Sequence, residues 1–351
     1  MTRTRVAPPE FWRFFFILFI CFLHFEEDVY DKVHLIANAG YLGVDFFLLL
    51  SGFVVSMNHH ISPINSVFQY TIKRVKKIYP DFLFAIILMF VLWLLLDNEN
   101  GVLGIAGHIF STKYQFVFAN AFYPVELEMR SIWFLSYWLV GIIILATVLK
   151  RNYLRLAGVV ALSFMSWHVF NKGSLFNDSA IPEFLWSVRL IKCVSQVIIG
   201  ALAFDAYLHL KDIKFSKLGK FVLSAIEIAS VLFVIFIMAK KGRNLMDYEV
   251  CIAFIIIIIL SFLNNTFLSR ILDNRLSVFL GKLSLPIYLY HLFVVKIISV
   301  FWHNVDNKLV VYTATLASII VFAYLFHLLV VKLFKPGLKY CCSKMFVKEN
   351  D

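Results

Sequence analysis

The chain has 351 residues, of which 61% are hydrophobic and only 16% are charged. This balance excludes a soluble globular domain, and the apolar runs that recur along the whole chain indicate one polytopic membrane domain. The net charge of +11 would also suit a nucleic-acid-binding protein, but the cations cluster in alternate loops between the apolar runs. We therefore expect membrane lipid around the chain and no nucleic-acid partner.

Ten apolar runs predict ten transmembrane helices, and hence an all-α bundle. Their approximate ranges are 11–25, 41–57, 79–96, 131–149, 155–171, 189–209, 219–239, 248–264, 280–302 and 309–334. Most Lys and Arg residues outside these runs lie on one side if both termini are placed in the cytoplasm. The loop with Lys240, Lys241 and Arg243 disagrees with this orientation.

The rest of the predicted organisation concerns one ambiguous segment, the domain boundary and the cysteines. The stretch 101–120 is only moderately apolar, and we interpret it as a re-entrant or surface segment. Residues 1–340 are expected to form the transmembrane domain, and 341–351 a short cytoplasmic tail. The five cysteines are scattered without disulfide or metal-ligand spacing, so we expect no metal site.

The first predicted helix has a cation at one end and an imidazole at the other. Arg13 and His24 are eleven residues apart, which is three helical turns plus about 20°, so both project from one face. At about 1.5 Å per residue they stand about 16 Å apart along the axis. Ionisable groups inside a membrane usually face a protein interior or a wet cavity. The alternative is an Arg that snorkels to the lipid headgroups and an interfacial His.

The second informative stretch runs from Gly40 to Phe53. Gly40 and Gly43 at a helix start permit the close approach of another backbone or a ligand. Asp45 would lie inside the span, where a lone carboxylate needs a partner. The alternative is ordinary small-residue packing with Asp45 at the membrane interface.

The third stretch, 70–80, is basic. Lys73 and Lys77 are i,i+4 neighbours and Arg74 and Lys77 are i,i+3, so the three cations share one side of a helix. We expect Pro80 to open the next span. The cations suit a phosphate cradle, although cytoplasmic loops are basic without any function.

Two later stretches place polar or aromatic groups in spans. Trp133 opens the fourth span, where an aromatic belt explains it without a function. Gly281, Ser284, Tyr288 and His291 fall within an arc of about 80° on the ninth span, and Pro286 is expected to kink it. This polar stripe predicts either a cavity wall or a structural hydrogen-bonded face.

Together these stretches resemble the acyltransferase-3 family of integral membrane acyltransferases. Arg13 and His24 are similar to its Arg-x10-His motif, and Gly43 through Phe53 to its Gly-Val-x-x-Phe-Phe-x-x-Ser-Gly-Phe segment. Lys73 through Pro80 resembles its Arg-Arg-x-x-Arg-Ile-x-Pro motif, and Gly281 through His291 its late Gly-x-x-Ser-x-x-Ile-Tyr-Leu-x-His segment. The motifs follow the family order.

The resemblance implies O-acetyl transfer in a bacterial inner membrane, from cytoplasmic acetyl-coenzyme A to a sugar hydroxyl of a surface polysaccharide such as an O-antigen or exopolysaccharide. Glycan or lipid-linked sugar would be the acceptor; the sequence carries no signal for an oligomeric state. The expected catalytic residues are His24, as general base or transient acyl carrier, with Glu26 or Asp45 as its carboxylate partner. Donor binding is assigned to Arg13, Lys73, Arg74 and Lys77, and acceptor binding to Trp133, Ser284, Tyr288 and His291.

The sequence also departs from the family pattern. Lys73 and Lys77 replace arginines, which keeps the charge but loses the guanidinium fork. Trp138 stands where many members carry a Glu, which puts in doubt an acceptor contact made by that Glu. The alternative functions are a transporter or flippase of lipid-linked glycans and a polysaccharide polymerase, and we expect both to carry larger polar outer loops.

Overall fold

The computed structural model describes residues 6–30, 37–96, 133–172, 188–240, 245–302 and 308–334, together with Pro336 and scattered residues of 104–118. The predicted tail 341–351 and most of the stretch 101–120 lie outside this part of the chain. Within it the chain forms helices and no strand.

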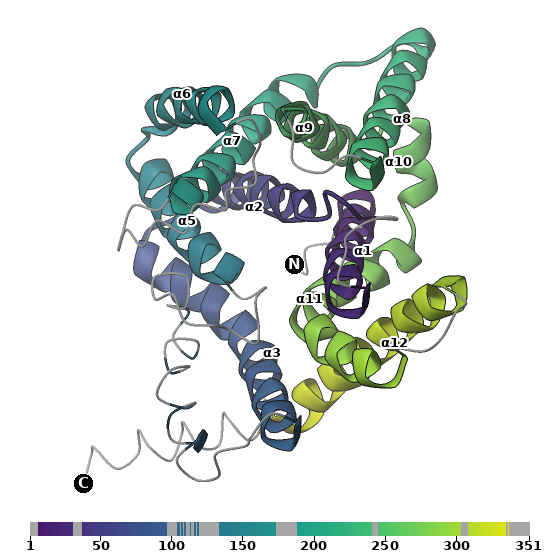
Figure 1. The fold of residues 1–351 in the computed structure, drawn as a ribbon. Coiled ribbons are helices and arrows are strands. Elements are labelled where there is room, and N and C mark those ends of the chain that lie inside the picture. The colour runs from purple at the N-terminus through teal and green to yellow at the C-terminus, as the bar shows by residue number, and fades with distance from the viewer. Residues whose placement is uncertain are drawn as a thin grey trace, which may run out of the picture.

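Figure 1 shows how the described helices are arranged in the bundle. In chain order they are α1 (Ala7–Tyr30), α2 (Leu42–Ile61), α3 (Val67–Leu96), α5 (Trp133–Lys150), α6 (Leu154–Lys172), α7 (Val188–Leu210), α8 (Lys217–Lys240), α9 (Asp247–Leu263), α10 (Phe267–Leu272), α11 (Arg275–Trp302), α12 (Lys308–Leu329) and the π-helix η4 (Val330–Phe334).

Each of the ten predicted spans coincides with a helix, which confirms the all-α polytopic bundle. Among the described residues, eight helices are long and apolar enough to cross a membrane: α1, α2, α3, α5, α7, α8, α11 and α12. The other two predicted spans are α6, which has lower mean hydropathy, and α9, which has 17 residues. The ten-span count and the orientation of the termini stay predictions.

The expected role of Pro80 is wrong. Pro80 does not open a span, because α3 begins at Val67 and runs through it, so the basic stretch and the apolar stretch form one 30-residue helix. A proline inside a helix removes one donor and one backbone hydrogen bond, which a long, packed helix can tolerate. Likewise α11 begins at Arg275 and continues through Pro286.

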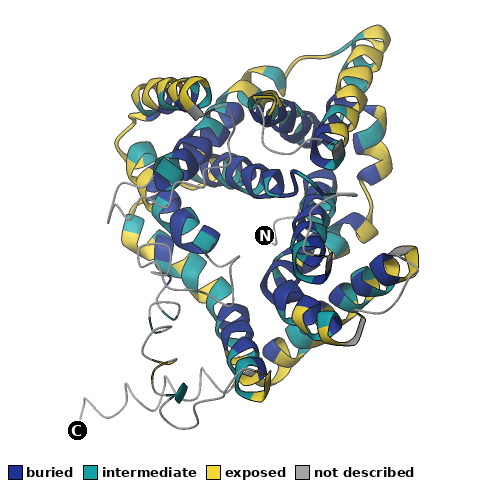
Figure 2. Cartoon of the chain, viewed as in Figure 1, coloured by how far each residue is buried: buried dark blue, intermediate teal, exposed yellow. Residues whose placement is uncertain are grey.

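Helices α1 and α2 occupy the centre of the bundle. α1 packs most extensively against α11, and α2 against α7. One apolar cluster joins α1 and α2 to α3, α5, α11 and α12, and a second joins them to α8 and α9. Figure 2 shows the same division: the inward sides of α1, α2, α7 and α11 are buried, whereas α6 and α8 are largely exposed.

Two glycines allow α2 and α7 to cross closely. A Cβ on Gly52 would overlap the backbone carbonyl of Val197, and a Cβ on Gly200 would overlap that of Leu49. Small residues at such crossings let membrane helices pack backbone against backbone. The Ser51–Gly52 break in the apolar run is therefore a packing contact that fixes α2 against α7.

Candidate active site

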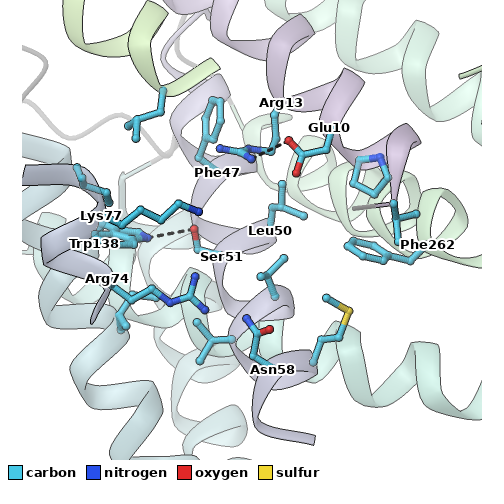
Figure 3. A pocket seen from close by; sticks show the side chains of 18 residues that line it. Glu10, Arg13, Phe47, Leu50, Ser51, Asn58, Arg74, Lys77, Trp138 and Phe262 are labelled. Atoms are coloured by element: carbon cyan, nitrogen blue, oxygen red, sulfur yellow. Dashed lines mark hydrogen bonds and ion pairs between the residues drawn. The ribbon is translucent and has the colours of Figure 1, made fainter. Parts of the chain in front are cut away.

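A cavity of about 430 Å³ opens between the first turns of α1, the second half of α2, and α3 and α5. Its cationic side chains are Arg13 from α1 and Arg74 and Lys77 from α3 (Figure 3). Its apolar wall includes Phe47, Leu50, Trp138, Ile142 and Leu285. The tertiary structure thus brings residues of all four sequence motifs to one cavity.

The cations are held by local contacts. Arg13 Nη1 lies 2.9 Å from a carboxylate oxygen of Glu10, one turn earlier on α1. Arg74 donates a hydrogen bond of 2.8 Å to the Tyr70 hydroxyl and lies over the Tyr70 ring, 5.1 Å from its centroid. Three cations and one carboxylate line the cavity, so its charge favours an anionic ligand.

Lys73 does not belong to this group. It is exposed on α3 and does not line the cavity, whereas Lys77, which is also exposed and lies one turn further along α3, does. The predicted four-cation cluster is therefore a three-cation cluster of Arg13, Arg74 and Lys77.

Glycine 281 connects the late motif to this cavity. A Cβ at Gly281 would overlap the side chain and backbone of Glu10, the ion-pair partner of Arg13. Ser284 donates a hydrogen bond of 2.8 Å to the Gly281 carbonyl, so its hydroxyl is used within α11. These contacts pack α11 closely against α1. Neither contact shows that Ser284 can reach an acceptor sugar.

Three turns beyond Arg13, the imidazole of His24 on α1 stacks against that of His291 on α11. The rings of His24 and His291 have centroids 5.4 Å apart and an interplanar angle of 30°. His24 Nδ1 lies 3.2 Å from a carboxylate oxygen of Glu27, and His291 Nδ1 lies 2.8 Å from the Tyr288 carbonyl. Each Nδ1 therefore donates a proton, which leaves each Nε2 as the basic nitrogen.

The two Nε2 atoms differ in what surrounds them. His291 is fully buried, and its Nε2 has no hydrogen-bond partner within the described part of the chain. His24 is partly exposed. Buried polar atoms are rarely left unpaired, so the pair of rings marks a place where a ligand group can bind.

Glu26 and Asp45, the carboxylates predicted to orient His24, contact residues on other helices. The Tyr312 hydroxyl donates to Glu26 at 2.7 Å, and Asp45 forms an ion pair of 3.0 Å with Lys192 of α7. The carboxylate beside His24 is that of Glu27, one helical turn further on. The structure therefore adds Glu27 to Glu26 and Asp45 as a candidate for the group that orients His24, and the i,i+3 spacing could have indicated it.

The other two predicted acceptor residues, Tyr288 and Trp133, are not among the residues that line the cavity. Tyr288 is buried against Phe134, and its ring centroid lies 6.0 Å from that of His291. Trp133 begins α5 and lies under the Arg189 guanidinium, 5.3 Å from its carbon. Trp138, which departs from the family pattern, donates a hydrogen bond of 3.1 Å to Ser51 in the cavity (Figure 3).

One comparison with known proteins gives a match. The family model described as an acyltransferase domain matches residues 9–337, nearly the whole chain. No curated protein and no solved structure matches the chain.

Proposed function

The chain belongs to the acyltransferase-3 family and is an integral membrane acyltransferase, and from this premise we propose that it transfers an acetyl group from acetyl-coenzyme A to a sugar hydroxyl. The product would be an O-acetyl ester on a surface polysaccharide such as an O-antigen or exopolysaccharide. The protein would act in a bacterial inner membrane, with the donor on the cytoplasmic side.

One arrangement carries this proposal: a cation-lined cavity and a histidine pair, whose members on α1, Arg13 and His24, lie three turns apart on one helix. Arg13, Arg74 and Lys77 have the charge to hold the donor's phosphates at the cavity. His24 lies about 16 Å further along α1, a distance that an extended arm of the donor has to span. The residues present therefore fit an anionic donor with a reactive end remote from its phosphates.

His24 is the proposed general base. Glu27 accepts its Nδ1 proton and fixes the ring, so Nε2 is free to take the proton from the acceptor hydroxyl. The hydroxyl oxygen then attacks the thioester carbonyl, the carbon–sulfur bond breaks, and the thiolate leaves and takes up the proton from His24. His291 Nε2 would accept a hydrogen bond and hold a second hydroxyl of the acceptor. A transient acyl group on His24 is the alternative route.

The test is transfer of labelled acetyl from acetyl-coenzyme A to glycan in membranes containing the protein. We expect ester-linked label in the glycan that mild alkali removes, and none with His24→Gln. Label that appears with equal yield in both would overturn the assignment of His24. No label with the intact chain, but label with a longer acyl thioester, would overturn only the choice of acetyl.

A further inference from the structure

A second cavity, of about 460 Å³, lies on the other side of α2 from the first. Met57 and Asn58 face the first cavity, whereas the neighbouring residues of α2 face the second. The turn between α5 and α6 and the last turns of α7 complete it. Its polar lining residues are Ser56, His59, His60, Asn152, Arg155 and Asp205. No motif of the acyltransferase site accounts for this group.

The second cavity holds one charge of each sign. Arg155 and Asp205 interact electrostatically, but neither side chain makes an ion pair or hydrogen bond within the described part of the chain. Both charges are therefore available to a ligand. A simple anion would meet Asp205, and a simple cation would meet Arg155, so the lining favours a molecule that carries both charges.

Two neutral side chains that line the same cavity as Arg155 can also donate hydrogen bonds. The Ser56 hydroxyl is buried and has no hydrogen-bond partner in the described residues. His59 Nδ1 accepts the Ile64 amide at 3.1 Å, so its Nε2 carries the proton and can donate. A buried hydroxyl left unpaired is costly unless a bound molecule satisfies it.

The surface beside the cavity is apolar. α6 starts at Leu154 in the cavity wall, and its exposed face continues through Leu156, Val159 and Val160. Figure 2 shows this helix exposed along most of its length. Exposed Lys150 and Arg151 flank the same turn, as basic residues do where a membrane protein meets lipid phosphates.

We propose that this cavity binds the phosphoethanolamine headgroup of a membrane phospholipid. The phosphate lies against Arg155, Ser56 and His59, the primary ammonium donates to Asp205, and the acyl chains lie along the exposed face of α6. This site is separate from the acyltransferase site and does not depend on the proposed reaction.

The experiment is lipid binding to the purified, delipidated protein in detergent, followed by native mass spectrometry. Phosphatidylethanolamine, phosphatidylcholine and phosphatidylglycerol are compared at matched chain length. We expect phosphatidylethanolamine to bind about tenfold tighter or more than the other two, the factor that one charged hydrogen bond gives. Phosphatidylcholine keeps the positive charge but lacks the N–H donors, so it isolates the contact with Asp205.

Variants with matched controls assign the residues. Asp205→Asn should remove the preference for phosphatidylethanolamine over phosphatidylcholine, whereas Asp212→Asn, an exposed change at the end of the same segment, should keep it. Arg155→Gln should weaken binding of all three lipids, and Arg270→Gln, a change of an exposed arginine on α10 outside the cavity, should not. Ser56→Ala, which leaves both charges in place, should weaken lipid binding by a smaller factor. Thermal unfolding checks that each variant is folded.

Three results would overturn the proposal. Equal affinity for the three lipids would show annular lipid only. Tighter binding of phosphatidylglycerol would show a site for a simple anion. Glycerophosphoethanolamine, the soluble headgroup without chains, binding as tightly as the lipid would show that the ligand is not a membrane lipid.

Discussion

Two regions of the molecule place ionisable groups between the helices, and the contacts of these groups differ. Between α2 and α7, Asp45 and Lys192 are both buried and paired with each other at 3.0 Å. At the cavity of α1 and α3, by contrast, three cations face open space, and at the histidine pair a buried Nε2 has no partner. Paired groups hold helices together, whereas groups left facing a cavity can bind or react.

The reason lies in the cost of charge in a low-dielectric interior. A buried charge is tolerated when an opposite charge and hydrogen bonds satisfy it, and such a pair then contributes to helix placement. Hydrogen bonds alone satisfy the buried Glu227 on α8, which accepts them from the hydroxyls of Thr266 and Ser269. Substitutions in the two regions should therefore act differently, on folding at the Asp45–Lys192 pair and on acyl transfer at the cavity and the histidine pair.

His24→Gln should abolish acyl transfer with little change in stability. A positioned acid–base group contributes about 10²–10⁴-fold to the rate, and an amide cannot take the proton. The measurement is the initial rate of acetyl transfer, together with the unfolding midpoint in detergent. If the variant kept near-normal transfer, His24 would be structural and the base would have to be sought at His291.

Breaking the Asp45–Lys192 pair should have the opposite profile. Lys192→Met leaves Asp45 buried without its cation and should lower the free energy of unfolding by about 3–5 kcal/mol. The double change Asp45→Asn with Lys192→Met should recover part of that loss, because no charge is left unpaired. The check is thermal or denaturant unfolding of all three proteins. If the double variant were as unstable as Lys192→Met, the loss of stability would not come from an unpaired Asp45.

Arg74→Glu should weaken donor binding while the protein still inserts in the membrane. Removing one charged hydrogen bond typically costs about 1.5–3 kcal/mol, and charge reversal costs more. We expect a rise in the KM for acetyl-coenzyme A that exceeds the fall in kcat. Lys73→Glu is the matched control, since it makes the same charge reversal one residue away and outside the cavity. If both variants changed the KM equally, Arg74 and Lys73 would act only as basic residues that orient the chain in the membrane.

Trp138→Phe should produce the smallest change. It removes the hydrogen bond to Ser51 but keeps an aromatic ring in the cavity wall. A neutral hydrogen bond contributes about 0.5–1.5 kcal/mol, so the KM for the donor should rise by no more than about tenfold. Donor titration of the steady-state rate measures it. A complete loss of transfer would give Trp138 a larger part in the chemistry than a wall residue has.

The sequence by itself determined the features that depend on local period. The apolar runs located all ten predicted helices, and the eleven-residue spacing placed Arg13 and His24 on one helix, α1. Four motifs in order identified the family, which the match over residues 9–337 confirms. These features follow from the composition of each segment and from the helical repeat of 3.6 residues per turn. Both depend only on residues that are close in the sequence.

Only the tertiary structure decided which helices face one another and with which side. It stacks His291 against His24 and pairs Lys192 with Asp45. It also leaves Lys73 outside the cavity that Arg74 and Lys77 line. Those pairings depend on the rotation and depth of each helix in the bundle. Close backbone contacts at Gly52, Gly200 and Gly281 fix the rotation and depth of these helices. The partners of these glycines lie far away in the sequence, so a local helical pattern cannot predict them.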